Sequence, residues 1–147
     1  MTEPTSTPLE PGADLRERVF TITRADLVAY AEASGDHNPI HQDEEVARSV
    51  GLPGVIAHGM YTLALVGSAV AEWTDGAEVV ALGAKFTSPV VVPADRGADV
   101  VVSGSVKTVD SGLVTLALQV TCEGQKVLGM PKAVVRQPVS PEAADRA

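Results

Sequence analysis

The chain has 147 residues, which is enough for one domain with a buried core and leaves little room for a second. Its net charge is -8 and its eleven basic residues are scattered, which disfavours nucleic-acid binding because that function needs a concentrated positive face. The single cysteine, Cys122, excludes an intramolecular disulfide, and the most apolar stretch, Met60 to Trp73, is too short for a convincing membrane span. With no secretory signal recognisable in the first residues, we expect a cytoplasmic protein without nucleic-acid or membrane partners.

The two ends of the chain differ in composition from its body. Residues 1–12 and 138–147 are rich in proline and polar residues, which is typical of flexible tails. The body, residues 13–137, contains no internal repeat. We therefore expect it to form a single domain.

The first part of the body predicts one strand and two helices. Residues 18–23 alternate in polarity, as a half-buried strand does. Thr23 and Asp26 have the spacing of a capping pair and Gly35 is a typical stop signal, so a helix is expected between them. A short acidic helix is expected at residues 43–50.

One long helix is predicted at residues 58–73. It is apolar almost all round, and a helix without a wide polar face is normally buried. The periodicity then becomes that of strands, which we expect at residues 78–87, 98–109, 113–122 and 126–136. Asp110-Ser111-Gly112 and Glu123-Gly124 are turn signals that join consecutive strands as hairpins. The predicted fold class is α+β, with an antiparallel sheet wrapped around a long central helix.

Residues 34–41 bring together groups suited to proton transfer. Asp36 and His41 share this loop, and a carboxylate beside an imidazole can move protons near neutral pH. Pro39 prevents a regular helix, so the two side chains can converge. The alternative is that Asp36 caps the next helix and His41 is a satisfied polar group. A zinc pair of His37 and His41 is disfavoured because Pro39 removes the helical face that such a pair shares, and we expect no metal.

The start of the long helix is a second candidate site. Gly59 lies where backbone N–H groups are free and the helix dipole is positive. Without a side chain, this residue would let a carbonyl oxygen approach its N–H, as an oxyanion hole requires. The alternative is that Gly59 only eases a tight helix entry and that His58 is a polar cap.

Three segments carry a resemblance to a known family. Asp36-His37-Asn38-Pro39-Ile40-His41 resembles the D-x-N-P-[IL]-H motif of MaoC-like (R)-specific enoyl-CoA hydratases and (3R)-hydroxyacyl-ACP dehydratases. Ala57-His58-Gly59-Met60 is similar to a second signature of that family, and Phe86-Thr87-Ser88-Pro89-Val90 to a third. The resemblance covers about residues 13–136, and it is strongest to the single-domain catalytic B subunit of mycobacterial-type dehydratases.

The resemblance implies a hot-dog fold and reversible syn hydration of trans-2-enoyl thioesters, the reverse of (3R)-hydroxyacyl thioester dehydration. It implies that Asp36 and His41 activate water and that the Gly59 N–H holds the thioester oxygen. Asn38 would order the active-site loop, together with the ring of Pro39. No cofactor is expected. Two alternatives stay open, a hot-dog thioesterase and a non-catalytic acyl-binding subunit of a heterodimeric dehydratase.

The expected partners are an acyl-CoA or acyl-ACP substrate and a second subunit. A homodimer is expected, or a heterodimer with a related chain. Gly67 and Ser68 leave little bulk in the long helix, which would admit an acyl chain, although close backbone packing would also explain the glycine. Met130-Pro131-Lys132 departs from the family pattern and puts the end of the last strand in doubt, because proline cannot donate to a sheet ladder.

Overall fold

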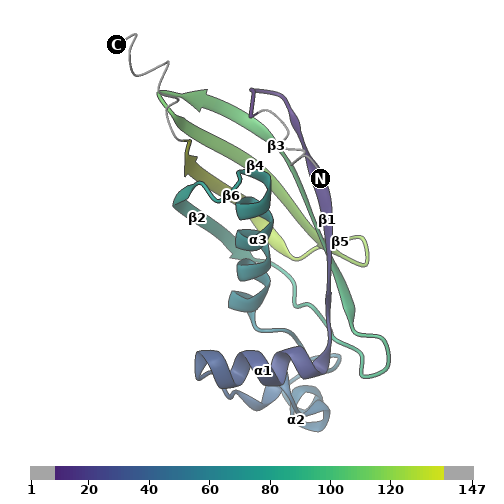
Figure 1. Cartoon of the computed structure of the whole chain (residues 1–147). Helices are drawn as coiled ribbons and strands as arrows, with labels where there is room; N and C mark the ends of the chain where they lie inside the picture. The colour runs from purple at the N-terminus through teal and green to yellow at the C-terminus, as the bar shows by residue number, and fades with distance from the viewer. Residues whose placement is uncertain (1–8, 138–147) are drawn as a thin grey trace, which may run out of the picture.

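The computed structural model describes residues 9–137, so residues 1–8 and 138–147 of the predicted tails lie outside it. Six strands form one antiparallel sheet, and a long helix lies against one face of that sheet (Figure 1). The elements are β1 (Asp14–Ile22), α1 (Arg24–Ser34), the 3-10 helix η1 (Pro39–His41), α2 (Glu44–Ser49), α3 (Gly59–Trp73), β2 (Glu78–Phe86), β3 (Ala98–Asp110), β4 (Leu113–Cys122), β5 (Gln125–Lys126) and β6 (Leu128–Arg136). This arrangement confirms the predicted α+β class.

The sheet has the strand order β1-β3-β4-β6-β2, with the short β5 paired to β4. Both predicted hairpin turns are present, and Ser111-Gly112 and Glu123-Gly124 have the positive φ angles that two-residue hairpin turns require. The strand predicted at 126–136 is divided into β5 and β6, and β1 begins earlier than expected, at Asp14. The strands β1 and β2 form the two open edges.

Pro131 lies inside β6, where the sequence left the strand in doubt. Met130 has a φ of 46°, and the register with β2 shifts between Gly83, which faces Lys132, and Lys85, which faces Gly129. Two residues of β6 therefore lie opposite one residue of β2, as in a β-bulge. The pairing of β6 with β4 begins only after the proline, at Lys132. The bulge removes the need for a ladder N–H at Pro131.

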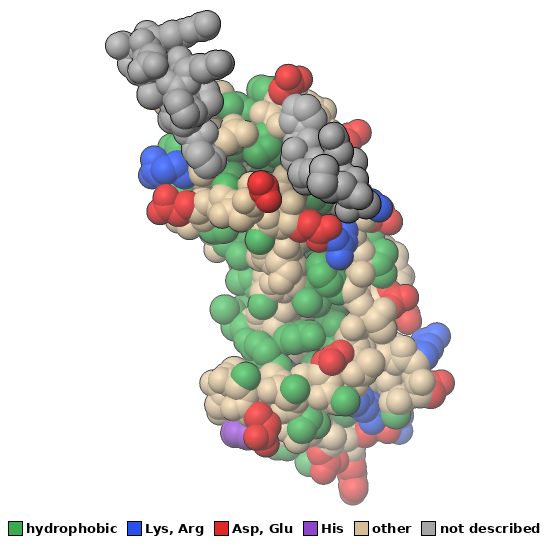
Figure 2. Space-filling model, in the orientation of Figure 1, with side chains coloured by type: hydrophobic (Ala, Val, Ile, Leu, Met, Phe, Trp, Pro, Cys, Tyr) green, Lys and Arg blue, Asp and Glu red, His purple; other side chains and the backbone are tan. Residues whose placement is uncertain are grey.

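The helix α3 is buried on one face only, which corrects the expectation of burial all round. Its buried positions follow the helical period, and they are Thr62, Val66, Ala69, Val70 and Trp73. Met60 and Ala64 on the other side are exposed, and so is much of β2. Figure 2 shows hydrophobic side chains gathered over α3 and β2 in the middle of this face. The helix therefore carries more apolar surface than the single chain buries.

The two short helices are placed at the N-terminal end of α3 (Figure 1). The capping box predicted for α1 is present, since Thr23 Oγ1 accepts from the Asp26 N–H at 3.2 Å and Asp26 Oδ2 accepts from the Thr23 N–H at 2.8 Å. Gly35 ends the helix in the left-handed conformation, with φ at 80°. The chain is thereby directed from α1 into the loop that carries Asp36. No helix among residues 9–137 is long and apolar enough to cross a membrane.

Candidate active site

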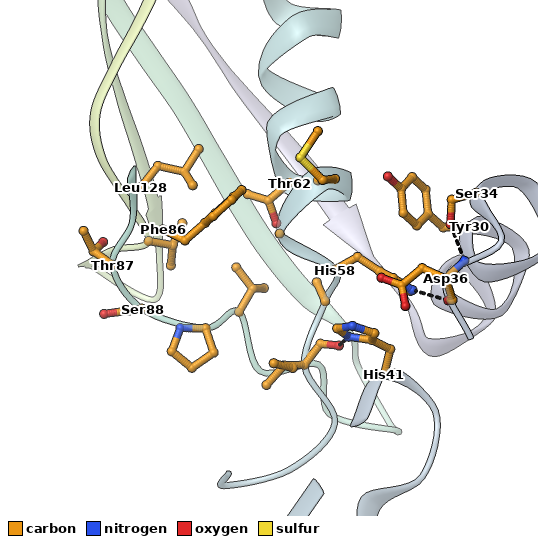
Figure 3. Close-up of a pocket in the computed structure, with 17 residues that line it drawn as sticks. Tyr30, Ser34, Asp36, His41, His58, Thr62, Phe86, Thr87, Ser88 and Leu128 are labelled. Carbon is orange, nitrogen blue, oxygen red and sulfur yellow. Dashed lines mark hydrogen bonds between the residues drawn. The ribbon is translucent and has the colours of Figure 1, made fainter. Parts of the chain in front are cut away.

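A pocket of about 620 Å³ opens at the N-terminus of α3, a volume typical of small-molecule sites. Figure 3 shows Asp36, His41 and His58 gathered on one side of it, with Phe86, Thr87 and Ser88 on the other. The first group comes from the loop after α1 and from the segment before α3. The second group comes from the last residue of β2 and the two residues that follow it. All three segments that resemble the family signatures therefore contribute to the wall of one pocket.

His41 is buried, and its ring is fixed by one short contact. Its Nδ1 lies 2.8 Å from the carbonyl oxygen of Ile56. Because a carbonyl oxygen can only accept, Nδ1 must carry the hydrogen in this contact. In the neutral ring the other nitrogen, Nε2, is then an unprotonated acceptor. His41 also lines the pocket, so it has the tautomer of a general base.

The loop that carries Asp36 is held by contacts between close neighbours. Asp36 Oδ1 accepts from the Asn38 N–H at 3.2 Å, and Asn38 Oδ1 accepts from the Ile40 N–H at 3.2 Å. Pro39 opens η1, where its fixed φ suits the first helical position. These turns bring the Asp36 carboxylate and the His41 ring to the same pocket over a separation of five residues.

His58 completes a cluster that the sequence had divided between two motifs. It is only 2% exposed, and its ring stacks on that of His41 with centroids 3.8 Å apart. Its Nε2 lies 3.1 Å from the carbonyl oxygen of Asp36, and burial lowers its pKa below the ordinary 6.5. As the N-cap of α3 it makes no side-chain capping bond, so its predicted role as a polar cap is wrong. His37 is exposed and does not line the pocket.

Asp36, His41 and His58 each offer a possible metal-ligand atom, and these atoms lie within 4.8 Å of one another. Their geometry fits a metal poorly. The two imidazoles are stacked with their planes 23° apart, so the in-plane lone pairs run side by side instead of meeting at one ion. One nitrogen of each ring contacts a backbone carbonyl, as it would in a metal-bound histidine, so this contact does not distinguish the two uses. The stacking of the rings makes the cluster better suited to proton transfer than to tetrahedral coordination.

Gly59 is the first residue of α3 and lines the same pocket. The first turn of the helix is closed by the N–H groups of Tyr61 and Thr62, which both bond to the carbonyl of His58. The N–H of Gly59 therefore has no partner within its helix. A Cβ at this position would lie 2.9 Å from the Phe86 ring, so the absence of a side chain lets that ring lie against the helix start.

The remaining candidates lie away from this pocket. Gly67 and Ser68 are in the middle of α3 and do not line it. A Cβ on Gly67 would meet only Leu82 Cδ2, at 3.6 Å, so close backbone packing does not explain the glycine. Cys122 is buried in β4, and burial raises the pKa of its thiol, as expected for a small core residue.

Comparison with known proteins decides the family. The model of the MaoC like domain matches residues 7–126, which is most of the chain. The chain belongs to this family. A solved structure titled MaoC-like dehydratase superimposes with a TM-score of 0.85 at 34% identity, covering 92% of this chain and 42% of that one. The hot-dog fold implied by the sequence motifs is confirmed.

Two further relatives have more specific names. The 3-hydroxyacyl-thioester dehydratase X of Mycobacterium tuberculosis is 42% identical over 80 residues, covering 54% of this chain. This chain spans only 28% of the length of that protein. The R-hydratase PhaJ1 from Pseudomonas aeruginosa has a TM-score of 0.77 and 29% identity, covering 89% of this chain and 84% of that one.

Proposed function

We propose that this domain adds water to trans-2-enoyl thioesters and, in reverse, dehydrates (3R)-hydroxyacyl thioesters of CoA or acyl carrier protein. One observation carries the proposal: Asp36, His41 and Gly59 line the same pocket. His41 presents an unprotonated Nε2 there, and Gly59 has a backbone N–H that is free within its helix. The names of a thioester dehydratase and an R-hydratase among the relatives support the same chemistry.

The reaction needs a base for water and a donor for the thioester oxygen. His41 Nε2 and the Asp36 carboxylate bind one water, and the pair accepts a proton as the water oxygen attacks C3. Negative charge moves to the thioester oxygen, where the Gly59 N–H stabilises the enolate together with the positive end of the α3 dipole. The proton that the pair accepted is then returned to C2 on the same face, which restores the pair, so that the H and the OH of one water have been added.

Two other functions make different predictions for one experiment. A hot-dog thioesterase would attack the thioester carbon and release free thiol, whereas a binding subunit would do neither reaction. We therefore propose to incubate the purified chain with crotonyl-CoA and to follow the loss of the enoyl absorbance and the release of thiol in parallel. Water addition without thiol release is expected. Thiol release, or no reaction with a correctly folded homodimer, would overturn the proposed hydratase.

We also propose that the domain works as a dimer joined through β2 and the exposed face of α3. The strand β2 is a sheet edge with Val79 and Val80 exposed and only two charged residues, whereas the other edge, β1, carries four charged residues, Asp14, Arg16, Glu17 and Arg18. Open apolar edges favour pairing, and charges oppose it. A second copy related to the first by a twofold axis would cover both exposed surfaces. A related chain with a similar edge would give the heterodimer.

The acyl chain would run from this pocket toward the middle of α3, past Gly67 and Ser68. Support comes from the space beside Gly67, where only the tip of Leu82 lies within 4 Å of an added Cβ. Leu82 lies on β2, and a long substrate that enters here would displace the end of its side chain. Substrate length would then be set at this position.

A further inference from the structure

The side chain of His58 links the two halves of the proposed catalytic machinery. It contacts the loop of Asp36 through a hydrogen bond and the ring of His41 through stacking, and it directly precedes Gly59 in the chain. We propose that His58 is a positioning residue that holds the Asp36–His41 pair in register with the Gly59 N–H. This inference rests on the proposed hydratase function and assigns a role to a residue that need not touch substrate.

The hydrogen bond to Asp36 fixes which tautomer His58 adopts. The carbonyl oxygen of Asp36 can only accept, so Nε2 carries the hydrogen and, in the neutral ring, Nδ1 is a bare acceptor. Within the described residues, His58 Nδ1 and Thr62 Oγ1 are buried atoms without a hydrogen-bond partner. The two residues are one helical turn apart and chemically complementary, because a single bridging water could accept from a hydroxyl and donate to a bare ring nitrogen.

His41 can act as a base more readily if His58 beside it is neutral. The two rings are stacked 3.8 Å apart, so a positive charge on His58 would oppose proton uptake by His41. Burial and the neighbouring His41 both keep His58 neutral, and Tyr30 packs edge-on against it at 4.7 Å without adding charge. The hydrogen bond to the Asp36 carbonyl and, more weakly, the Asp36 carboxylate act the other way and favour the charged ring, but burial prevails and the pKa of His58 is lowered. His41 can then accept a proton from water beside an uncharged ring.

The same short segment contacts each part of the proposed site. The carbonyl of Ile56 fixes His41, the side chain of His58 fixes the Asp36 carbonyl, and the next N–H belongs to Gly59. Four consecutive residues, 56–59, therefore set the distance between the base and the oxyanion donor. Small misplacements of such groups cost up to about 100-fold in rate, so loss of the His58 contact should be visible in kcat.

The kinetic test uses two variants of different chemistry. His58→Phe keeps a flat ring against His41 but removes the donor to the Asp36 carbonyl, whereas His58→Gln keeps an N–H donor. We expect kcat for crotonyl-CoA hydration to fall about 10- to 100-fold in His58→Phe with little change in KM, and to recover largely in His58→Gln. A wild-type kcat in His58→Phe would overturn the inference. A second result would also overturn it. If kcat falls equally in both variants and the fall follows a lowered melting temperature, His58 has a packing role alone.

A second measurement does not depend on activity. The chain has three histidines, so nitrogen-15 NMR of the histidine rings, assigned with His37→Gln and His58→Gln, can resolve each tautomer. We expect His58 to be neutral and protonated at Nε2 at pH 7, with His41 protonated at Nδ1. A His58 ring protonated at Nδ1, or one that titrates like exposed His37, would overturn the positioning role even in an active enzyme. A wild-type chain with these tautomers but no hydration activity would overturn the proposed function instead.

Discussion

Asp36 and His41 act on one water in the proposed reaction, although different contacts hold them. His41 is fixed by the carbonyl of Ile56, and Asp36 by turns within its own loop. Groups that act on the same atom lose their effect together, because either one is of little use alone. The chemistry at the scale of single residues can therefore be tested by combining substitutions.

The first prediction concerns this pair. Asp36→Asn and His41→Ala should each lower kcat for crotonyl-CoA hydration by about 10²- to 10⁴-fold, and the double variant should be little worse than either single one. His37→Ala is the matched control, because His37 is exposed and outside the pocket, and it should keep full activity. Losses that multiply in the double variant would argue against a shared water.

The pair could be predicted from the sequence, and its neighbour His58 could not. The motif from Asp36 to His41 is local, so its spacing and its proline are visible in the printed chain. The contacts of His58 with Asp36 and Tyr30 span 22 and 28 residues, and nothing in the intervening sequence indicates them. Its position one residue before Gly59 is the available signal, and a helix cap is an alternative explanation of a polar residue at that position.

At the scale of elements, α3 provides both the proposed oxyanion donor and the proposed acyl path. Its first residue, Gly59, follows His58, whose φ of -59° and ψ of 132° are extended. This conformation is compatible with a following proline, and proline is well tolerated at the first position of a helix. The backbone N–H of residue 59 can therefore be removed without breaking the helix.

The second prediction uses that tolerance. Gly59→Pro and Gly59→Ala both add a Cβ that must displace the Phe86 ring, now 2.9 Å from that position, but only proline removes the N–H. We expect kcat for hydration to be about 10²- to 10³-fold lower in Gly59→Pro than in Gly59→Ala, because one oxyanion donor is lost. Circular dichroism would verify that both are folded. Equal rates in the two variants would exclude this N–H as the oxyanion donor.

The third prediction concerns Gly67 in the middle of α3. Gly67→Ala should raise the free energy of unfolding by about 0.5–1 kcal/mol, because glycine is a poor helix former and an added Cβ meets only Leu82 at 3.6 Å. Gly67→Leu should reduce activity on long enoyl-CoA substrates more than on crotonyl-CoA, whereas Gly67→Ala should preserve the length profile. If activity falls equally on substrates of every chain length, the acyl chain does not run past Gly67.

At the scale of the whole molecule, one side of the sheet and helix has no partner within the chain. Exposed valines of β2 and the outer face of α3 lie on this side, and contiguous apolar surface of this kind marks an interface. A charge placed at the centre of such an interface is costly, whereas a charge elsewhere on the surface is not.

The fourth prediction tests the dimer. Val80→Lys, at a valine 48% exposed on the β2 edge, should convert the dimer to a monomer in light scattering and lower crotonyl-CoA hydration. Val50→Lys is the control, because Val50 is 63% exposed after α2, away from β2, and it should leave the assembly unchanged. A chain that is monomeric and active before any substitution would overturn the dimer. A chain that is inactive until a related subunit is added would favour the heterodimer over the homodimer.

The fifth prediction follows from the lowered pKa of His58. Well above its ordinary pKa of 6.5 the residue is neutral in both the folded and the unfolded chain. As the pH falls, the unfolded chain takes up a proton that the folded chain resists, so the free energy of unfolding decreases until the folded pKa is passed. His58→Gln removes this contribution but keeps Asp36, His41 and Tyr30 around the site. Its melting temperature should therefore fall less than that of the wild type between pH 8 and pH 5, and parallel curves would contradict the buried neutral ring.

Local signals in the chain predict most of the elements, the family and the pair proposed for catalysis, because capping residues, turn glycines, strand alternation and the loop motif all act over a few neighbouring residues. Only the tertiary structure revealed the bulge that accommodates Pro131, the half-exposed α3, and the stacking of His58 on His41. These features depend on which surfaces meet after the chain has folded, and apolar periodicity is the same for a helix covered by its own sheet and for one covered by a second subunit. Contacts between segments remote in the chain therefore decided how the site is held together.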